Sequence, residues 1–308
     1  MRFPPLHHEK VVDMISRCGF EPSGQLIPLG CLENRVFWAP TVSGDDLVVK
    51  VYRPGRWDVE QLDEEHEVLF ECEDQGIEVV APKDLGDGYT LDSLSSEGID
   101  CSCAIFPFIQ GRMRDELDLD QLEQLGDLIA RMHQVLASRS KDTMRRPKDN
   151  LEALEIWLDS HLNLPVHFRQ RAQFWVRQIH ADGFLSELQW IHGDCHLGNM
   201  IWNDEGPWLI DFDDVGLGWF GQDLWLVAPG VSHEQTKKRA ALFAGYGQSV
   251  GVGVLDERLP LLKALRMLNY TRWLSERWGD PSFLNAYPDF GTESFWSKEC
   301  EALDELNF

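Results

Sequence analysis

The segment from Trp190 to Leu226 constrains the fold of this chain more than any other part, because polar motifs and short apolar runs alternate within it. It reads HGDCHLGN at 192–199 and IDFDD at 210–214. Apolar residues at 200–202 and 208–210 flank the turn-rich string NDEGP. These runs predict two strands joined by a short loop. We therefore expect a hairpin that returns the second acidic motif to the side of the first.

The residue types in these motifs match the needs of phosphoryl transfer. That reaction asks a protein for oxygens that hold Mg²⁺ and for an acceptor for the proton of the attacking hydroxyl. Asp194 is the predicted acceptor. Asn199 offers an amide oxygen that ligates Mg²⁺ without acting as a base, and Gly198 before it permits a tight loop. With Asp211 as the carboxylate ligand, the segment predicts a kinase that uses ATP and Mg²⁺.

Taken singly, these residues indicate little, because aspartate and glycine beside strands are common turn formers. The hypothesis depends on the ordered set around one hairpin. Asp213 and Asp214 fit either a group near the metal or a surface turn. Asp223 opens an apolar helix, and its position alone is typical of an N-cap.

Lys50 lies in the middle of the apolar strand predicted at 47–52, so its ammonium must either reach water or form an ion pair. In the acidic helix that starts at Asp58, the apolar spacing places Glu65 on the buried stripe and Glu64 one residue round the helix. We therefore predict a Lys50–Glu65 ion pair that holds the lysine on the nucleotide phosphates. The alternative is an acidic helix face in water.

Two other N-terminal segments are candidates for nucleotide contact. The turn at 30–33, which contains Cys31, could cover phosphates with backbone N–H groups, although an ordinary hairpin turn explains it as well. The strand at 103–109 is interrupted by proline, as expected of a connector between lobes whose freed backbone groups bond an adenine edge. Phe106 and Phe108 would supply the apolar slot.

The rest of the pattern is mainly helical. Residues 6–18 predict a short helix, and 122–136 predict an amphipathic core helix with His133 as a structural histidine. The basic stretch 138–150 is interpreted as a solvated linker, with a docking loop as the alternative. Further helices are predicted over 151–162, 165–181, 233–249 and 256–278.

Composition excludes some functions. A formal charge of −24 argues against nucleic-acid binding, which requires clustered lysine and arginine. Around an active cleft, acidic residues would favour a cationic partner. The seven cysteines form no disulfide framework, and Cys101 and Cys103 are expected to pack as reduced thiols in a strand. Because no apolar run suits a signal peptide or a membrane span, we expect a cytoplasmic protein with no membrane partner. A chain of 308 residues can bury a large core as a monomer.

Together these motifs resemble those of the aminoglycoside phosphotransferase and choline kinase-like family, relatives of the protein kinases. In particular the chain is similar to a bacterial, cytoplasmic branch of stress-response Ser/Thr protein kinases. The resemblance implies the roles given above for Asp194, Asn199, Asp211 and Lys50, and it implies that Asp223 steadies the catalytic loop. The segments that carry it lie at 33–36, 48–57, 64–66, 106–112, 125–133, 192–199, 210–214, 222–224 and 277–283. At Cys31 the chain departs from these relatives, where we align a serine.

We therefore expect an α+β, bilobal protein-kinase-like fold. A small N-terminal β-sheet lobe over residues 1–106 would bind the nucleotide, and a larger, mainly helical lobe over 107–308 would bind the substrate and carry out catalysis. The expected acceptor is a protein Ser or Thr. A small-molecule hydroxyl, on an aminoglycoside, choline or a sugar-like compound, is the alternative.

Two other classes compete with this prediction. A metal-dependent hydrolase could use His192, Asp194, His196 and Asp211 as ligands, although Asn199 suits Mg²⁺ better. A pseudokinase that only binds nucleotide is disfavoured because, apart from a glycine-rich loop, the expected catalytic positions are present.

Overall fold

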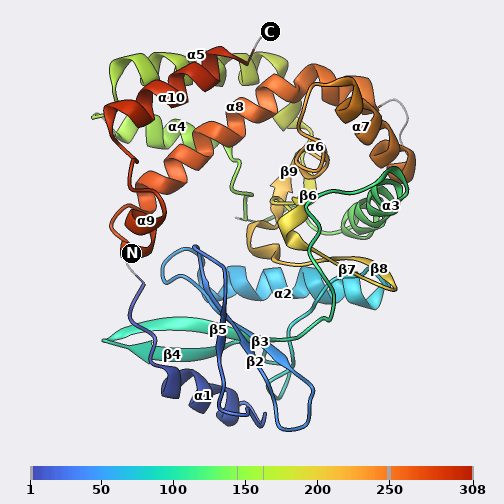
Figure 1. Ribbon diagram of the computed structural model, residues 1–308, viewed down its shortest axis with the longest axis vertical. Coiled ribbons are helices and arrows are strands. Elements are labelled where there is room, and N and C mark those ends of the chain that lie inside the picture. Colours follow the sequence, from blue (N-terminus) through green and yellow to red (C-terminus); the bar gives the residue numbers. More distant parts are fainter. Residues whose placement is uncertain (1–2, 144, 162, 248–250, 307–308) are drawn as a thin grey trace. The chain divides into compact units, whose positions relative to one another are not determined.

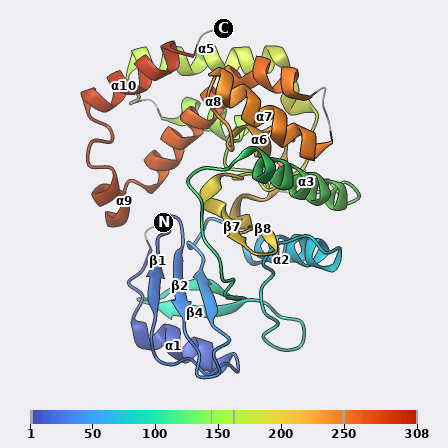
Figure 2. The same ribbon diagram turned by 45° about the vertical axis from the view of Figure 1, so that its right-hand side comes forward.

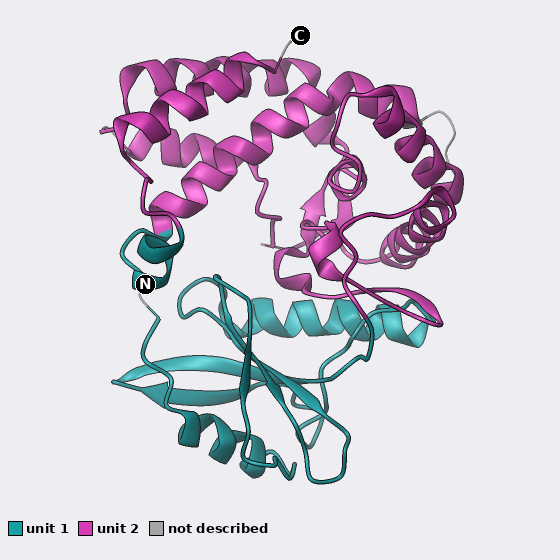
Figure 3. Cartoon of the chain, in the orientation of Figure 1, with its two compact units in different colours: residues 1–111, 277–286 teal, residues 112–276, 287–308 magenta. Residues whose placement is uncertain are grey.

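The computed structural model describes residues 3–143, 145–161, 163–247 and 251–306. The chain forms two compact units (Figure 3). The first contains residues 1–111 and 277–286, and the second contains residues 112–276 and 287–308. As predicted, the first unit is built on a β-sheet and the second is mainly helical (Figure 1). No helix among the described residues is long and apolar enough to cross a bilayer.

A five-stranded antiparallel sheet organises the first unit. Its strands, in spatial order, are β1 (Ile27–Leu29), β2 (Arg35–Ala39), β3 (Leu47–Val51), β5 (Ile99–Pro107) and β4 (Asp92–Ser96). Alternate residues of β3 and β5 are buried with the apolar face of α1 (His8–Arg17). Cys101 and Cys103 lie in this core as free thiols, so the prediction that they pack in a strand is confirmed.

The helix that follows β3 is α2 (Val59–Asp74). It begins with a capping box, in which the Asp58 side chain accepts from the backbone N–H of Gln61 and the Gln61 side chain accepts from that of Asp58. The predicted stripe is confirmed, because its members are all buried. They are Leu62, Glu65, Leu69 and Cys72. The short helix α9 (Pro281–Ala286) belongs to the same unit.

The second unit contains the helices α3 (Leu119–Leu136), α4 (Leu151–Ser160), α5 (Val166–Asp182), α6 (Gly221–Trp225), α7 (His233–Tyr246), α8 (Gly251–Arg277, its last residue in the first unit) and α10 (Glu293–Asp304). α3 and α7 pack closely (Figure 2), because a Cβ at Gly126 or Gly245 would lie 2.0 or 1.8 Å from a backbone oxygen of the other helix. The predicted helices are present, although the expected ends of α4 at residue 162 and of α7 at residue 249 lie outside the described residues.

Short strands and single turns connect these helices to the motif region. β6 (Gln189–Ile191) pairs with β9 (Gly216–Gly218), and β7 (Met200–Asn203) pairs with β8 (Gly206–Leu209). The second pair is the predicted hairpin. Three 3-10 turns complete the region, namely η1 (Phe184–Ser186), η2 (Leu197–Asn199) and η3 (Phe212–Asp214).

The interpretation of the basic stretch 138–150 as a solvated linker is wrong for residues 145–150, which are buried or half-buried, whereas residues 138 and 140–142 are exposed as expected. Arg145 is fully buried and donates from Nε to the carbonyl of Val215 and from Nη2 to that of Asp213, both at 2.8 Å. Its guanidinium therefore satisfies backbone acceptors around η3 that lie away from water. The hydrogen bonds of Arg145 join residues that are far apart in the chain, so they produce no local sequence pattern. From the sequence, the stretch is therefore recognisable only as polar.

Candidate active site

The HGD motif lies in the loop after β6, and its histidine ties the two acidic motifs together. His192 is fully buried; Nε2 lies 3.0 Å from the carbonyl of Ile210, and Nδ1 lies 3.3 Å from the backbone nitrogen of Asp194. Nδ1 therefore accepts and Nε2 donates. Because both ring nitrogens bond the backbone, His192 acts as a cross-link and is not available as the zinc ligand that a hydrolase would need.

The backbone of the same loop is held by a buried carboxylate. Asp223 accepts from the backbone N–H groups of His192 at 2.7 Å and Gly193 at 2.9 Å, and it lies 3.0 Å from Nε2 of His133. The N-cap of α6 is Phe220, so the interpretation of Asp223 as an N-cap is wrong. The hydrogen bonds of Asp223 instead steady the loop, as the resemblance implied. His133 contacts this carboxylate and has the expected structural role.

Asp194 lies among three basic side chains. Its Oδ1 lies 2.7 Å from Nη2 of Arg266, and its Oδ2 lies 3.4 Å from Nζ of Lys148 and 3.7 Å from Nε2 of His196. Burial alone would raise the pKa of Asp194, but its contact with His196 and the charges of Lys148 and Arg266 hold that pKa well below its ordinary value. The side chain is therefore an ionised acceptor with little tendency to keep a proton.

Asn199 and Asp211 are connected through the backbone, as the predicted hairpin required. The N–H of Ile210 donates to the carbonyl of Asn199 at 3.0 Å, which brings the residue before Asp211 beside η2. The Asn199 side chain donates from Nδ2 to the carbonyl of Asp194 at 2.9 Å, so its amide oxygen Oδ1 is the atom left to act as a ligand. Asp211 is exposed and has a left-handed φ of 61°.

This donor set fits a hard cation. An amide oxygen and a carboxylate are ligands that Mg²⁺ accepts together with phosphate oxygens and water. Among the described residues, no group of three or more His, Cys, Asp or Glu side chains is arranged to hold a metal ion. Any metal held by Asn199 and Asp211 would therefore need most of its ligands from a nucleotide and from water.

The contacts of Arg266 with Asp194 and Asp149 were not predicted from the sequence. Arg266, on α8, contacts Asp149 as well as Asp194, with 3.4 Å between Nη1 and Oδ2 of Asp149. Burial raises the pKa of Asp149, and Arg266 and Lys148 oppose that effect. Nothing in the local sequence distinguishes Arg266 from other charged residues of its helix, because its partners are far away along the chain.

In the first unit, the predicted Lys50–Glu65 pair is confirmed. Nζ of Lys50 lies 3.3 Å from Oε1 of Glu65, and both side chains are buried. The hydroxyl of Tyr52 donates to the same oxygen at 3.3 Å and lies 2.9 Å from Nε2 of His66. The ammonium also lies 4.8 Å from the centre of the Tyr52 ring, a cation–π distance. These contacts fix the lysine on β3 against α2.

The three remaining predicted nucleotide contacts also lie in this unit. The Sγ of Cys31 accepts from the backbone N–H of Asn34 at 3.4 Å, which closes the turn before β2. Phe108 stacks on Trp38 with ring centres 5.2 Å apart, and the rings of Phe106 and His66 are nearly perpendicular with centres 6.0 Å apart. A contact between these side chains and a nucleotide stays a prediction.

Two of the family-like segments meet in the first unit although they are far apart in the sequence. Glu33, from 33–36, pairs with Nη2 of Arg277, from 277–283, at 2.9 Å. Arg53 lies 3.2 Å from Glu33 and 3.0 Å from Oδ2 of Asp280. Burial opposes ionisation of Glu33, yet the neighbouring arginines lower its pKa. The network therefore attaches residues 277–286 to the loop before β2.

Comparison with known proteins decides the family. The profile of the phosphotransferase enzyme family, APH, matches residues 24–261. The chain belongs to this family. Stress response kinase A of Salmonella choleraesuis is 32% identical over 323 residues, which cover 98% of this chain and 93% of the relative. A relative from Salmonella typhimurium strain LT2, named serine/threonine protein kinase RdoA, has the same identity and coverage. The enzyme is therefore a phosphotransferase of the kinase type.

The fold of the APH family is also evident in solved structures. The amicoumacin kinase hAmiN, in complex with AMP-PNP, Ca²⁺ and Ami, superposes with a TM-score of 0.76 at 17% identity and covers 98% of this chain and 92% of its own. At this identity the likeness shows the fold alone. The expected α+β, kinase-like fold is confirmed.

Proposed function

We propose that this phosphotransferase is an ATP- and Mg²⁺-dependent Ser/Thr protein kinase that acts in the cytoplasm as a monomer during stress. The observation that carries the proposal is the loop in which the Asp194 carboxylate, the Asn199 amide and the backbone before Asp211 are joined by hydrogen bonds. The names of the relatives, at 30% identity or more over nearly the whole chain, support a protein hydroxyl as the acceptor.

Asp194 would accept the hydrogen bond of the substrate hydroxyl and orient its oxygen toward the phosphorus. Because Arg266 and Lys148 hold the carboxylate ionised, it would position the hydroxyl more than it would remove the proton early in the reaction. This suits a loose transition state, in which positioning and electrostatic stabilisation dominate. Asn199 and Asp211 would hold Mg²⁺, which when bound neutralises charge on the phosphates.

The first unit would bind the nucleotide. Lys50, fixed by Glu65, would contact the phosphates, and the turn that contains Cys31 would cover them with backbone N–H groups. Phe106 and Phe108 would border the adenine. The lobes proposed for these roles are residues 1–106 for the nucleotide and 107–308 for catalysis and substrate. Seven free cysteines agree with the reducing cytoplasm.

A small-molecule hydroxyl kinase is the second candidate, favoured by the similarity of the fold to amicoumacin kinase. The two functions are separated by incubating the purified chain with labelled ATP and two panels, one of proteins and peptides and one of aminoglycosides, cholines and sugars. We expect phosphate on Ser or Thr side chains, identified by mass spectrometry. Transfer only to a small molecule would establish the second candidate, and transfer to neither panel would contradict both.

The metal proposal has its own measurement. Calorimetric titration with ATP should give tighter binding with Mg²⁺ than without it. Asp211→Asn should remove most of that difference, because the carboxylate is the only charged ligand proposed. Glu205→Gln, an exposed carboxylate in the hairpin loop, is the matched control and should behave as the wild type. Equal Mg²⁺ dependence in the wild type and Asp211→Asn would exclude Asp211 as a ligand.

A further inference from the structure

The two oxygens of the Asp194 carboxylate differ in what can reach them. Oδ1 is buried and lies 2.7 Å from Nη2 of Arg266. The side chain as a whole is 13% exposed, so Oδ2 is the oxygen that a substrate hydroxyl can approach. On this oxygen, Nζ of Lys148 donates a hydrogen bond at 3.4 Å. The oxygen proposed to receive the hydroxyl therefore already has an ammonium beside it.

The ammonium of Lys148 is held loosely at this position. Its distance to Oδ2 exceeds the roughly 2.7–2.9 Å of a charge-assisted hydrogen bond. Among the described residues this is the one hydrogen bond that the ammonium makes, although a lysine has three N–H groups. The neighbouring basic group, Nε2 of His196, lies farther from Oδ2, at 3.7 Å. Lys148 therefore retains donors for a second anion beside the proposed acceptor oxygen.

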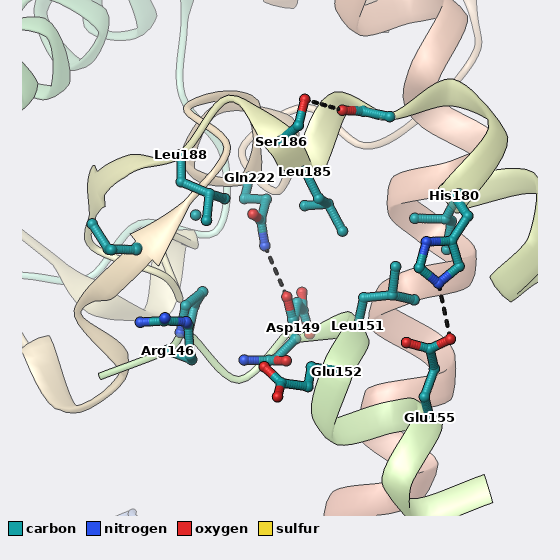
Figure 4. A pocket seen from close by; sticks show the side chains of 16 residues that line it. Arg146, Asp149, Leu151, Glu152, Glu155, His180, Leu185, Ser186, Leu188 and Gln222 are labelled. Carbon is teal, nitrogen blue, oxygen red and sulfur yellow. Dashed lines mark hydrogen bonds and ion pairs between the residues drawn. The ribbon is translucent and has the colours of Figure 1, made fainter. Parts of the chain in front are cut away.

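The backbone that carries this side chain is fixed. The carbonyl of Lys148 accepts from Nη2 of Arg272 at 3.1 Å, and the carbonyl of the next residue, Asp149, accepts from Nε2 of Gln222 at 3.1 Å (Figure 4). The ammonium itself lies 5.3 Å from the centre of the Trp273 ring, a cation–π distance. A fixed backbone with a flexible four-carbon stem allows the ammonium to turn toward a new anion without leaving the loop.

Arg266 makes the closer contact with Asp194, at 2.7 Å. It also pairs with Asp149 on its other side, so its guanidinium is held between two carboxylates. The Asp194 carboxylate therefore keeps a cationic partner when the ammonium of Lys148 turns away. This division leaves Lys148 as the cation that can serve the reacting group.

We propose that Lys148 is a catalytic residue that donates to the phosphoryl group as it passes from ATP to the hydroxyl on Oδ2 of Asp194. The bond from phosphorus to the ADP oxygen breaks and its electron pair leaves with ADP, while the bond to the hydroxyl oxygen forms. The hydroxyl proton departs late through Asp194, and Lys148 keeps its own protons. In a loose transition state the equatorial phosphoryl oxygens carry the charge that an ammonium stabilises. This role rests on the proposed function of Asp194, but not on the identity of the substrate.

Lys148→Met removes the charge and keeps most of the side-chain length. Its kcat should fall by about 100-fold or more, as for loss of a donor to developing charge, with ATP affinity nearly unchanged because the contact forms during transfer. Lys148→Arg should keep at least about a tenth of the wild-type kcat. Lys237→Met, at an exposed position on α7, is the matched control and should behave as the wild type. The thermal midpoint of each variant verifies folding.

A raised pH separates this role from a simpler one. If Lys148 only kept Asp194 ionised, its loss would raise the pKa of that carboxyl, and the rate of Lys148→Met would recover by about pH 9. We expect the rate to stay low. A near-normal rate for Lys148→Met at neutral pH, or its recovery at the higher pH, would overturn the proposal.

Aluminium fluoride with ADP and Mg²⁺ makes the test independent of the phosphate acceptor, because this anion imitates the phosphoryl group in transit. In calorimetric titrations it should tighten ADP binding to the wild type by about 100-fold or more. Lys148→Met should lose at least about tenfold of this gain, and Lys237→Met none. No gain in the wild type, or an equal gain in Lys148→Met, would overturn the proposal. Normal turnover by Asp194→Asn would instead contradict the proposed function of Asp194, while the binding result for Lys148 would stand.

Discussion

Gly193 shows how closely a single residue determines the shape of the catalytic loop. Its φ is +83°, and a Cβ there would lie 2.2 Å from the carbonyl oxygen of Asp214. The loop therefore needs glycine for its conformation and again for the close approach of η3. In the same loop, the backbone N–H groups of His192 and Gly193 donate to Asp223.

We expect Gly193→Ala to displace the loop and to lower the free energy of unfolding by more than about 2 kcal/mol, because strain and overlap combine. Gly183→Ala is the matched control. Gly183 has a similar φ of +74° but open space around it, so only strain of about 1 kcal/mol applies. Urea unfolding and phosphorylation rates measure both effects. Equal destabilisation of the two variants would mean that the contact with Asp214 does not constrain the loop.

At the residue scale, the sequence predicts what is local. Asp194, Asn199 and Asp211 are identifiable because their order and spacing surround one hairpin. Arg266 and Asp149 are not, because their contacts join α8 to a segment far from it in the chain. The misinterpretation of Asp223 has the same cause: its partners lie before the hairpin, whereas an N-cap is a local pattern.

Among the secondary-structure elements, β3 and α2 carry the part of the candidate site that periodicity predicts best. A lysine in an apolar strand and a glutamate on the buried stripe of the next helix give both partners of the ion pair. The segment 138–150 is the opposite case. It lacks periodicity, and the burial of its second half, residues 145–150, depends on Arg145 reaching backbone carbonyls that no local pattern reveals.

A double-mutant cycle measures whether Lys50 and Glu65 act as a unit. Lys50→Ala and Glu65→Gln should each weaken ATP binding and turnover, and the double variant should lose less than the sum by at least about 1 kcal/mol. Glu60→Gln, on the exposed side of α2, should change neither quantity. Additive losses would show that the 3.3 Å pair has no role in holding the lysine for the nucleotide.

For the whole molecule, the network around Glu33 shows how distant segments become one unit. Residues 277–286 fold with residues 1–111, and Arg53 and Arg277 supply the charges that join them. The two family-like segments at 33–36 and 277–283 were visible in the sequence, but their contact was not, because ion pairs between distant segments have no spacing to detect.

This network predicts an acid-sensitive fold. Burial opposes ionisation of Asp280, but hydrogen bonds from Ser282 and Arg53 lower its pKa. A carboxylate whose pKa is lowered on folding stabilises the protein above its unfolded pKa of about 4, and that contribution is lost as the pH falls through the folded value. The thermal midpoint should therefore drop below about pH 5, and less steeply in Asp280→Asn than in the wild type or in Glu60→Gln. Identical slopes for Asp280→Asn and the wild type would contradict this role.

The central claim is that this chain transfers phosphate from ATP with Asp194 as the acceptor of the hydroxyl hydrogen bond. The most direct measurement compares the wild type with Asp194→Asn for transfer of labelled phosphate, for ATP affinity with Mg²⁺, and for the thermal midpoint. We predict a loss of turnover of about 100-fold or more with ATP affinity nearly unchanged, because the side chain acts on the hydroxyl and not on the nucleotide. A folded Asp194→Asn variant that transfers phosphate at nearly the wild-type rate would contradict the claim.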